Sequence, residues 1–175
     1  MVLLKHIPLI GVHILVYGAL WWLIAPVASW GPLVLGALLV WISCRDIAIF
    51  EVPDVAAVLL VVTGVVLAPD MLWAFGSALL WAALYLGMRE AARLWMGQEA
   101  LGLGDVKLMG GLAAWLGPVA PIYVTLYASI AAIAALIALT LNRGVKLDEI
   151  ARTGIAFGPF LCLCAWGIWL WGFVS

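Results

Sequence analysis

Residues 54–88 read DVAAVLLVVTGVVLAPDMLWAFGSALLWAALYLGM, which is two apolar runs joined by Ala68-Pro69-Asp70. Pro69 blocks the continuation of a helix and biases the residue before it away from helical backbone angles. The tripeptide therefore predicts a tight turn between two helices, at about 54–68 and 71–88. Because both runs are almost free of charge, we expect both helices to cross a lipid bilayer.

The composition extends this expectation to the whole chain. Of the 175 residues, 68% are hydrophobic and 10% are charged, and the mean hydropathy is +1.25. An ordinary soluble domain is about a quarter charged, and a spanning helix needs about 20 apolar residues. We expect an all-α polytopic membrane protein with about six or seven transmembrane helices and no soluble domain. The net charge of −1 argues against a nucleic-acid partner.

The remaining spans are apolar runs that end at Pro, Gly or charge. Further tight turns are predicted at Trp30-Gly31-Pro32 and Gly117-Pro118. The first run follows Lys5, but it is too long for a signal peptide and has no small-residue cleavage site, so we expect it to be a span. The other expected spans are 7–27, 32–46, 105–117, 119–141 and 154–174.

The basic residues predict the orientation in the membrane. Threading the chain through the spans alternately places all eight Lys and Arg residues on one side, which the positive-inside rule assigns to the cytoplasm. We therefore expect a plasma (inner) membrane protein with a cytoplasmic N-terminus and an outside C-terminus. The residues on the cytoplasmic side are Lys5, Arg45, Arg89, Arg93, Lys107, Arg143, Lys146 and Arg152.

Two aspartates lie at the expected cytoplasmic ends of spans. Asp46 is followed by further apolar sequence, and Asp105 opens a span directly after Gly102-Leu103-Gly104. An ionisable residue inside a span is costly and marks a functional site by default. Each also has a purely structural interpretation, because Asp105 suits a helix N-cap and Asp46 suits an ion pair with Arg45 or another basic residue.

The pair suggests one chemistry in particular. Two neighbouring carboxyl groups hold roughly one proton between them, so that one can activate water while the other polarises a carbonyl group. No Ser-His-Asp arrangement competes, because His6 and His13 both lie in the first span. The three cysteines lack the spacing of a zinc site, so we expect no metal and no cofactor; they are Cys44, Cys162 and Cys164.

At these residues the sequence resembles the type IV prepilin peptidases, which share a G-x-G-D active-site motif with presenilin-like proteases. Residues 102–108 read GLGDVKL and resemble the family's longer G-x-G-D-x-K-L motif. Asp46 precedes Val52-Pro53-Asp54 at the spacing of the family's other catalytic motif, and residues 157–161 resemble its F-G-P-x-L segment.

The resemblance implies an aspartic endopeptidase that cuts the basic leader from a pilin-like or preflagellin-like precursor at the cytoplasmic face. It implies Asp46 and Asp105 as the catalytic pair, whereas Lys107 is expected at the lipid headgroups. We expect one transmembrane peptidase domain over 1–175, in which an extra N-terminal helix at 1–30 departs from the family pattern and precedes a core at 31–175. Methyl transfer is not expected, because the family's four-cysteine segment is lacking. The residues that shape the site or bind substrate are expected to be Gly102, Gly104, Lys107, Pro53 and Asp54.

Alternatives remain at this stage. The chain could be a catalytically inactive membrane scaffold of a pilus or secretion apparatus. A proton-coupled transporter would use the two acids as a relay, but it predicts a repeated architecture and the sequence has no internal repeat. For the peptidase we also predict that the segment from Arg89 to Gly104 is a mobile loop that admits the substrate; its alternative role is a passive linker.

Overall fold

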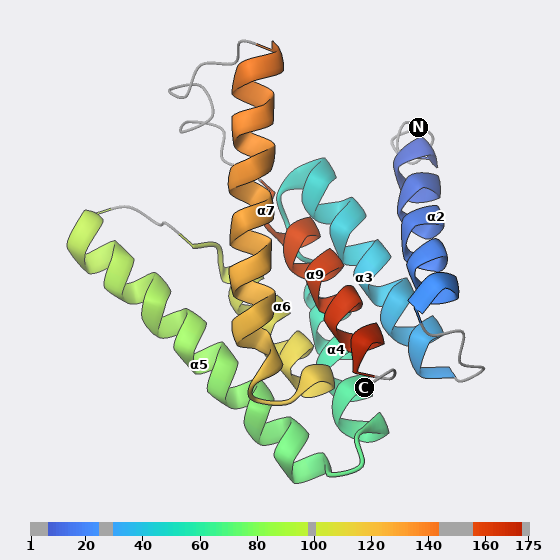
Figure 1. The fold of residues 1–175 in the computed structure, drawn as a ribbon. Coiled ribbons are helices and arrows are strands. Elements are labelled where there is room, and N and C mark those ends of the chain that lie inside the picture. Colours follow the sequence, from blue (N-terminus) through green and yellow to red (C-terminus); the bar gives the residue numbers. More distant parts are fainter. Residues whose placement is uncertain (1–6, 25–29, 98–100, 144–155, 173–175) are drawn as a thin grey trace.

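The computed structural model describes residues 7–24, 30–97, 101–143 and 156–172, and every regular element in these ranges is an α-helix. The helices form an up-and-down bundle, with consecutive helices running in opposite directions (Figure 1). They are α2 (Ile7–Ile24), α3 (Trp30–Ile49), α4 (Asp54–Leu67), α5 (Met71–Met96), α6 (Leu103–Leu116), α7 (Ala120–Arg143) and α9 (Gly158–Trp171). The predicted all-α class is confirmed.

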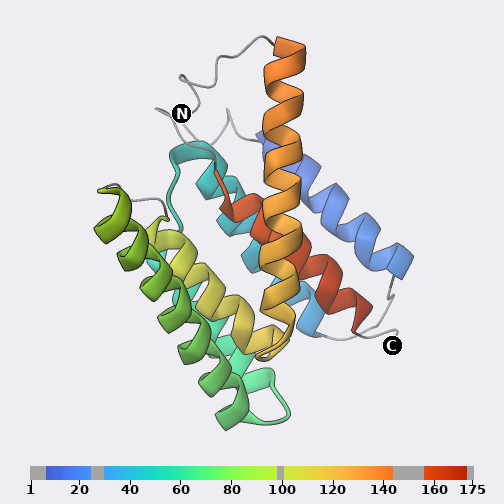
Figure 2. The same cartoon turned by 60° about the vertical axis from the view of Figure 1, so that its left-hand side comes forward.

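The bundle is built around α6 and α9. Helix α6 packs mainly against α4 and α5, whereas α9 packs mainly against α3 and α7. Helix α2, the extra N-terminal helix of the prediction, lies on the outside against α3 and α9 (Figures 1 and 2). The two inner helices therefore connect the α4–α5 hairpin to the N-terminal pair α2 and α3.

The hairpin predicted from residues 54–88 is present, but its second helix is longer than expected. Helix α4 ends at Leu67 and α5 begins at Met71, and the carboxylate of the N-cap Asp70 accepts a hydrogen bond of 3.0 Å from the backbone N–H of Trp73. The prediction that the second helix ends at residue 88 is wrong, because α5 continues to Met96. Glu90 joins neighbouring turns of this extension through an ion pair with Arg93 at 2.7 Å.

Helix α3 also differs from the prediction at both ends. Trp30-Gly31-Pro32 is not a turn but the start of α3, where proline is tolerated because the first N–H groups have no partner within the helix. The helix extends past residue 46 and ends at Ile49, and the next residue, Phe50, has a left-handed φ of 56°. Asp46 therefore lies inside the last turn, and its carbonyl oxygen accepts the Phe50 N–H at 2.8 Å.

Small residues allow α6 to approach its neighbours closely, as the run of Gly and Ala predicts. A Cβ atom on Gly111 would lie 2.7 Å from the Leu60 side chain of α4, and one on Gly110 would lie 3.2 Å from Ala82 of α5. Gly64 of α4 faces Ala114 in the same way, with a hypothetical Cβ distance of 2.7 Å. Larger side chains at these positions would force the helices apart.

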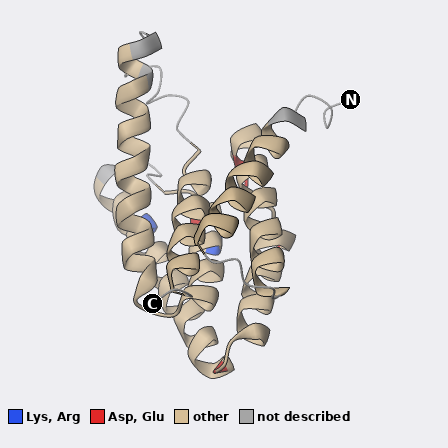
Figure 3. Cartoon of the chain, turned by 45° about the vertical axis from the view of Figure 1, so that its right-hand side comes forward, with Lys and Arg blue, Asp and Glu red and all other residues tan. Residues whose placement is uncertain are grey.

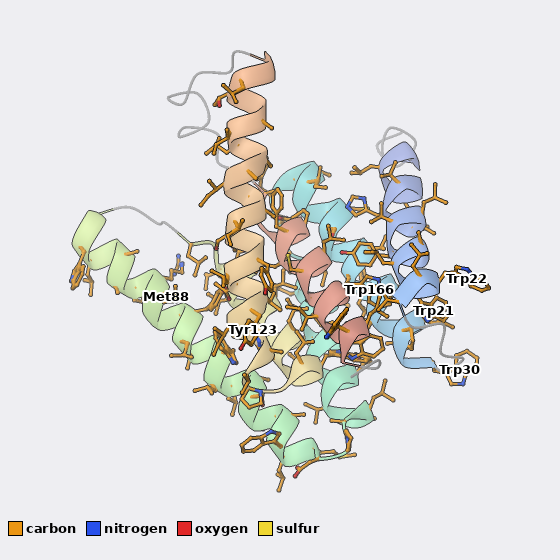
Figure 4. All side chains as sticks on the ribbon, in the orientation of Figure 1. Trp21, Trp22, Trp30, Met88, Tyr123 and Trp166 are labelled. Carbon is orange, nitrogen blue, oxygen red and sulfur yellow. The ribbon has the colours of Figure 1, made fainter. Side chains whose placement is uncertain are left out.

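The outer surface of the bundle is apolar, as expected for a protein in a bilayer. Lys, Arg, Asp and Glu occupy only a few short parts of the described ribbon (Figure 3). Trp22 and Trp30 are 77% and 80% exposed and project outwards, whereas Trp166 is buried between helices (Figure 4). In the described ranges, three helices are long and apolar enough to span a membrane, at Trp30–Ile49, Met71–Trp95 and Ala120–Ala138.

The remaining apolar helices include shorter ones, such as α4 and α9 with 14 residues each. At 1.5 Å per residue such a helix is about 21 Å long, less than the hydrocarbon core of about 30 Å. The chain is therefore a polytopic all-α membrane protein in which long and short helices alternate.

Candidate active site

Asp46 lies on the inner side of α3, facing α9. The residue is 7% exposed, and its Oδ2 accepts a hydrogen bond of 2.9 Å from the backbone N–H of Gly158. Gly158 is the first residue of α9, where backbone N–H groups have no acceptor within the helix and the helix dipole is positive. The end of α3 and the start of α9 thus hold the Asp46 carboxyl group between them.

Asp105 lies in the first turn of α6. The N-cap of this helix is Gly102, so the alternative in which Asp105 is itself the N-cap is wrong. The side chain instead reaches back to the backbone of Gly102, with Oδ2 lying 3.5 Å from the position that a Cβ of that residue would take. A carboxylate at this position is stabilised by the positive end of its own helix.

Asp46 and Asp105 lie within electrostatic range of each other. The thiol of Cys162, buried one turn along α9 from Gly158, lies within the same range of both acids. Arg45 is exposed, and neither Arg45 nor another base forms an ion pair with Asp46 among the residues that the structure describes, so the structural alternative of an ion pair is wrong.

The other residues predicted for the site join the two segments that carry the acids. Pro53 is the N-cap of α4, and Asp54 follows it in the first turn. Lys107 of α6 forms an ion pair with Asp54. This ion pair is the interaction of Lys107 that the structure shows, and its side chain is 44% exposed.

The two glycines of the motif have different environments. A Cβ on Gly104 would lie 3.0 Å from Cγ2 of the buried Val52, so this glycine allows α6 to approach the segment before Pro53 closely. Gly102 has an ordinary φ of −69°, and Gly104 lies within α6. Neither has the left-handed backbone that only glycine adopts easily; in the described ranges the glycines with positive φ are Gly97 and Gly117.

The predicted mobile segment from Arg89 to Gly104 is mostly not a loop. Residues up to Met96 are helical, Gly97 caps the helix, and residues 98–100 lie outside the described ranges. Arg89 donates a hydrogen bond of 3.1 Å from Nε to the carbonyl oxygen of Leu101. This bond ties α5 to the residue that precedes the N-cap of α6.

Gly158 belongs to the site but was not among the residues predicted for it. The only sequence signal is the stretch Phe157 to Leu161, which resembles a family segment but carries no reactive side chain. The contribution of Gly158 comes from a backbone N–H and from the lack of a Cβ atom. Neither property distinguishes it from other glycines in the sequence.

The sequence of the chain matches a known protein family. A model of the type IV leader peptidase family matches residues 33–139, a range that contains both aspartates. The chain is 31% identical over 155 residues to a prepilin leader peptidase/N-methyltransferase of Pectobacterium carotovorum subsp. carotovorum, covering 83% of this chain and 52% of the relative. It is 34% identical over 99 residues to one of Pseudomonas aeruginosa, covering 56% of this chain and 31% of the relative.

The match has a defined extent. A relative of the same description from Xanthomonas campestris pv. campestris is 28% identical over 154 residues, with 82% of this chain and 50% of the relative covered. The chain therefore spans at most about half the length of these curated relatives. No solved structure matches it. Because the family match covers more than half of the chain and includes both acidic motifs, the chain belongs to the type IV leader peptidase family.

Proposed function

We propose that this protein is an aspartic endopeptidase that removes the basic leader from a pilin-like or preflagellin-like precursor, with Asp46 and Asp105 as its catalytic pair. The observation that supports the proposal most is that Asp46, in the last turn of α3, and Asp105, in the first turn of α6, lie within electrostatic range of each other. Both belong to the range matched by the family, and the relatives are named prepilin leader peptidases. Those names support the peptidase; the aspartic mechanism rests on the paired acids.

The pair supplies both proton transfers that peptide hydrolysis needs. The ionised carboxylate takes a proton from a water molecule, and the water oxygen forms a bond to the carbonyl carbon of the scissile peptide. The protonated partner gives its proton to the carbonyl oxygen, so that a neutral tetrahedral intermediate forms. When the C–N bond breaks, the carboxyl group that took the water proton gives it to the leaving nitrogen, and the other carboxylate takes a proton from a hydroxyl group of the intermediate, so that the pair again holds one proton. No cofactor is required.

The contact between Gly104 and Val52 brings the start of α6 close to the segment that follows α3, and the exposed ion pair between Lys107 and Asp54 links α6 to α4. We assign Pro53 and Asp54 to the start of α4, where they help to place this segment. Gly102 leaves the backbone beside Asp105 open, since a Cβ there would contact the carboxylate. In this proposal the residues that shape the site without reacting are Pro53, Asp54, Gly102, Gly104 and Lys107.

The site lies on the cytoplasmic side of the inner membrane in this proposal. The even number of crossings made by α4 and α5 brings the end of α3 and the start of α6 to the same end of the bundle (Figure 1). Three basic residues belong to the same helix ends: Arg45 to the end of α3, Arg89 to the second half of α5 and Lys107 to the start of α6. By the positive-inside rule this end faces the cytoplasm, so the N-terminus is inside and the C-terminus outside.

The decisive experiment is cleavage by the purified protein. Incubation in detergent with lipid and a pilin-like precursor is expected to release the basic leader and leave the rest of the precursor intact. The alternative, an inactive membrane scaffold, predicts binding of the precursor without cleavage. Mass spectrometry of the products identifies the cut bond. Failure to cut any precursor encoded beside the gene, by protein that is folded and reconstituted, would contradict the proposal.

A further inference from the structure

The hydrogen bond between Gly158 and Asp46 joins two helices that are distant in sequence. The donor is the N–H of the first residue of α9, and the acceptor is Oδ2 of a carboxyl group that is 7% exposed. Gly158 lies outside the range 33–139 that the family model matches. The start of α9, which belongs to neither acidic motif, therefore donates this hydrogen bond to Asp46.

The lack of a side chain at residue 158 is a geometric requirement. A Cβ atom on Gly158 would lie 2.7 Å from Oδ2, 3.1 Å from Cγ and 3.4 Å from Cβ of Asp46. The first of these distances is shorter than real Cβ contacts, and Asp46 is buried where α3 packs against α9. A side chain at 158 would therefore require the Asp46 carboxyl group to move.

We propose that Gly158 is a positioning residue of the active site: its N–H holds Oδ2 of Asp46, so that Oδ1 is the oxygen that meets the catalytic water. This inference rests on the proposed function. An N–H donor at a helix start favours the ionised form of the carboxyl group that it contacts. Among the described residues, Asp105 of α6 and Cys162 of α9 are the titratable groups that interact with Asp46. In the described part of the chain, neither Asp105 nor Cys162 donates a hydrogen bond to Asp46.

The simplest variant, Gly158→Ala, has two effects at once: its Cβ fills the space beside Asp46, and its backbone N–H is displaced. An amide-to-ester exchange separates these effects. Glycolic acid incorporated at position 158 by nonsense suppression replaces the N–H with an oxygen atom and adds no Cβ. Since the first N–H groups of a helix have no intrahelical acceptor, this exchange breaks no helical hydrogen bond.

The matched control is the same exchange at Gly167, in the same helix. A Cβ there would meet nothing within 4 Å, and the residue lies in the interior of α9, where its N–H has a helical acceptor. The control should therefore weaken the helix more than the exchange at 158, and it should leave the active site alone. The proposal thus predicts that the Gly167 ester loses more stability while the Gly158 ester loses more activity. A merely structural role for Gly158 would make the loss of activity follow the loss of stability.

The first measurement is the pH profile of precursor cleavage. Relative to the Gly167 ester, the Gly158 ester is expected to lower kcat by at least about tenfold, with KM nearly unchanged, as for loss of a hydrogen bond to a charged group. The acidic limb of its profile should shift to higher pH, because the ionised form of Asp46 loses its donor. Equal kcat values and superimposable profiles for the two esters would overturn the proposal.

The second measurement does not depend on activity. The Tm loss caused by the Gly158 ester is determined in the natural chain and in an Asp46→Ala chain. The proposal predicts a clearly larger loss in the first than in the second, since only the first has the acceptor. The ester also weakens the Phe157 carbonyl, which accepts the N–H groups of Phe160 and Leu161, but this part of the loss is common to both chains. Equal losses would overturn it. If the natural protein cuts no precursor, the proposed function fails, while this thermal comparison still decides whether the bond exists.

Discussion

At the scale of single residues, three contacts link the segments that carry the proposed active site. Asp46 accepts the N–H of Gly158, Lys107 pairs with Asp54, and Gly104 lies against Val52. Each contact joins segments that are far apart in the sequence. The sequence motifs single out both acids together with Asp54, Gly104 and Lys107, but they do not predict which residues these contact.

The reason is physical. A carboxylate in an apolar run is conspicuous in the sequence, whereas a backbone N–H is present at every residue except proline. Lys107 was expected at the lipid headgroups because a lysine near a span end usually reaches them. Which acid lies within its reach depends on how α4 and α6 cross, and the sequence contains no direct record of that crossing.

The ion pair of Lys107 and Asp54 should contribute little to stability. The two side chains are 44% and 76% exposed, and exposed pairs contribute about 0.2–1 kcal/mol. Asp54→Asn is therefore expected to reduce cleavage only a fewfold. The reversed pair, Asp54→Lys with Lys107→Asp, should recover most of what either single reversal loses. Cleavage rates of the three reversal variants test this, and a double variant worse than both singles would contradict it.

The two motif glycines should differ in their sensitivity to substitution. Gly104→Ala places a Cβ 3.0 Å from Val52, tight enough to move the start of α6, whereas Gly102→Ala makes an ordinary contact of 3.5 Å with Asp105. Gly104→Ala is expected to lower kcat by about tenfold or more, since small misplacements of reacting groups are costly. Gly102→Ala should lower it less. Cleavage kinetics at equal protein level compare the two, and the reverse order would contradict the geometry.

At the scale of helices, turn chemistry was predictable and helix ends were less so. Ala68-Pro69-Asp70 and Gly117-Pro118 are turns as expected, since proline and glycine act locally. The end of α5 was predicted too early because Arg89, Glu90 and Arg93 resemble a solvated loop. Their ion pairs and the Arg89 contact with Leu101 instead accompany a continuous helix.

Close contact between α4 and α6 should control stability. Gly64→Ala would place a Cβ 2.7 Å from both Ala114 and Trp115, and overpacking of this kind costs about 1–3 kcal/mol. Gly87→Ala in α5 is the matched control, because a Cβ there meets nothing within 4 Å. Thermal unfolding in detergent should show a lower Tm for the first variant and an unchanged or higher Tm for the second. Equal Tm values would argue against tight packing of α4 on α6.

At the scale of the whole molecule, the alternation of helices places both acids at one end of the bundle. The all-α class and the hairpin followed from composition and proline placement. The association of α9 with α3 did not, because helices in a bilayer pair by shape rather than by hydrophobicity, and shape is a property of the assembled surface.

Sidedness can be tested with single cysteines at the two ends of α5. Its 26 residues span about 39 Å, enough to cross the bilayer core. In a chain without Cys44, Cys162 and Cys164, Asp70→Cys should react with an impermeant thiol reagent from outside intact cells. Trp95→Cys, at a position that is 91% exposed, should react only after permeabilisation. Labelling of both from the same side would contradict the topology and the argument that brings the acids together.

The most direct test of the central claim is the cleavage rate of the purified protein with each acid replaced in turn. Asp46→Asn and Asp105→Asn should each lower kcat by about 100-fold or more, and the double variant should be no worse than either, because the two act as one unit. Asp70→Asn, which keeps a good N-cap at the opposite end of the bundle, is the control and should cleave normally. Near-normal cleavage by either Asp46→Asn or Asp105→Asn would contradict the account.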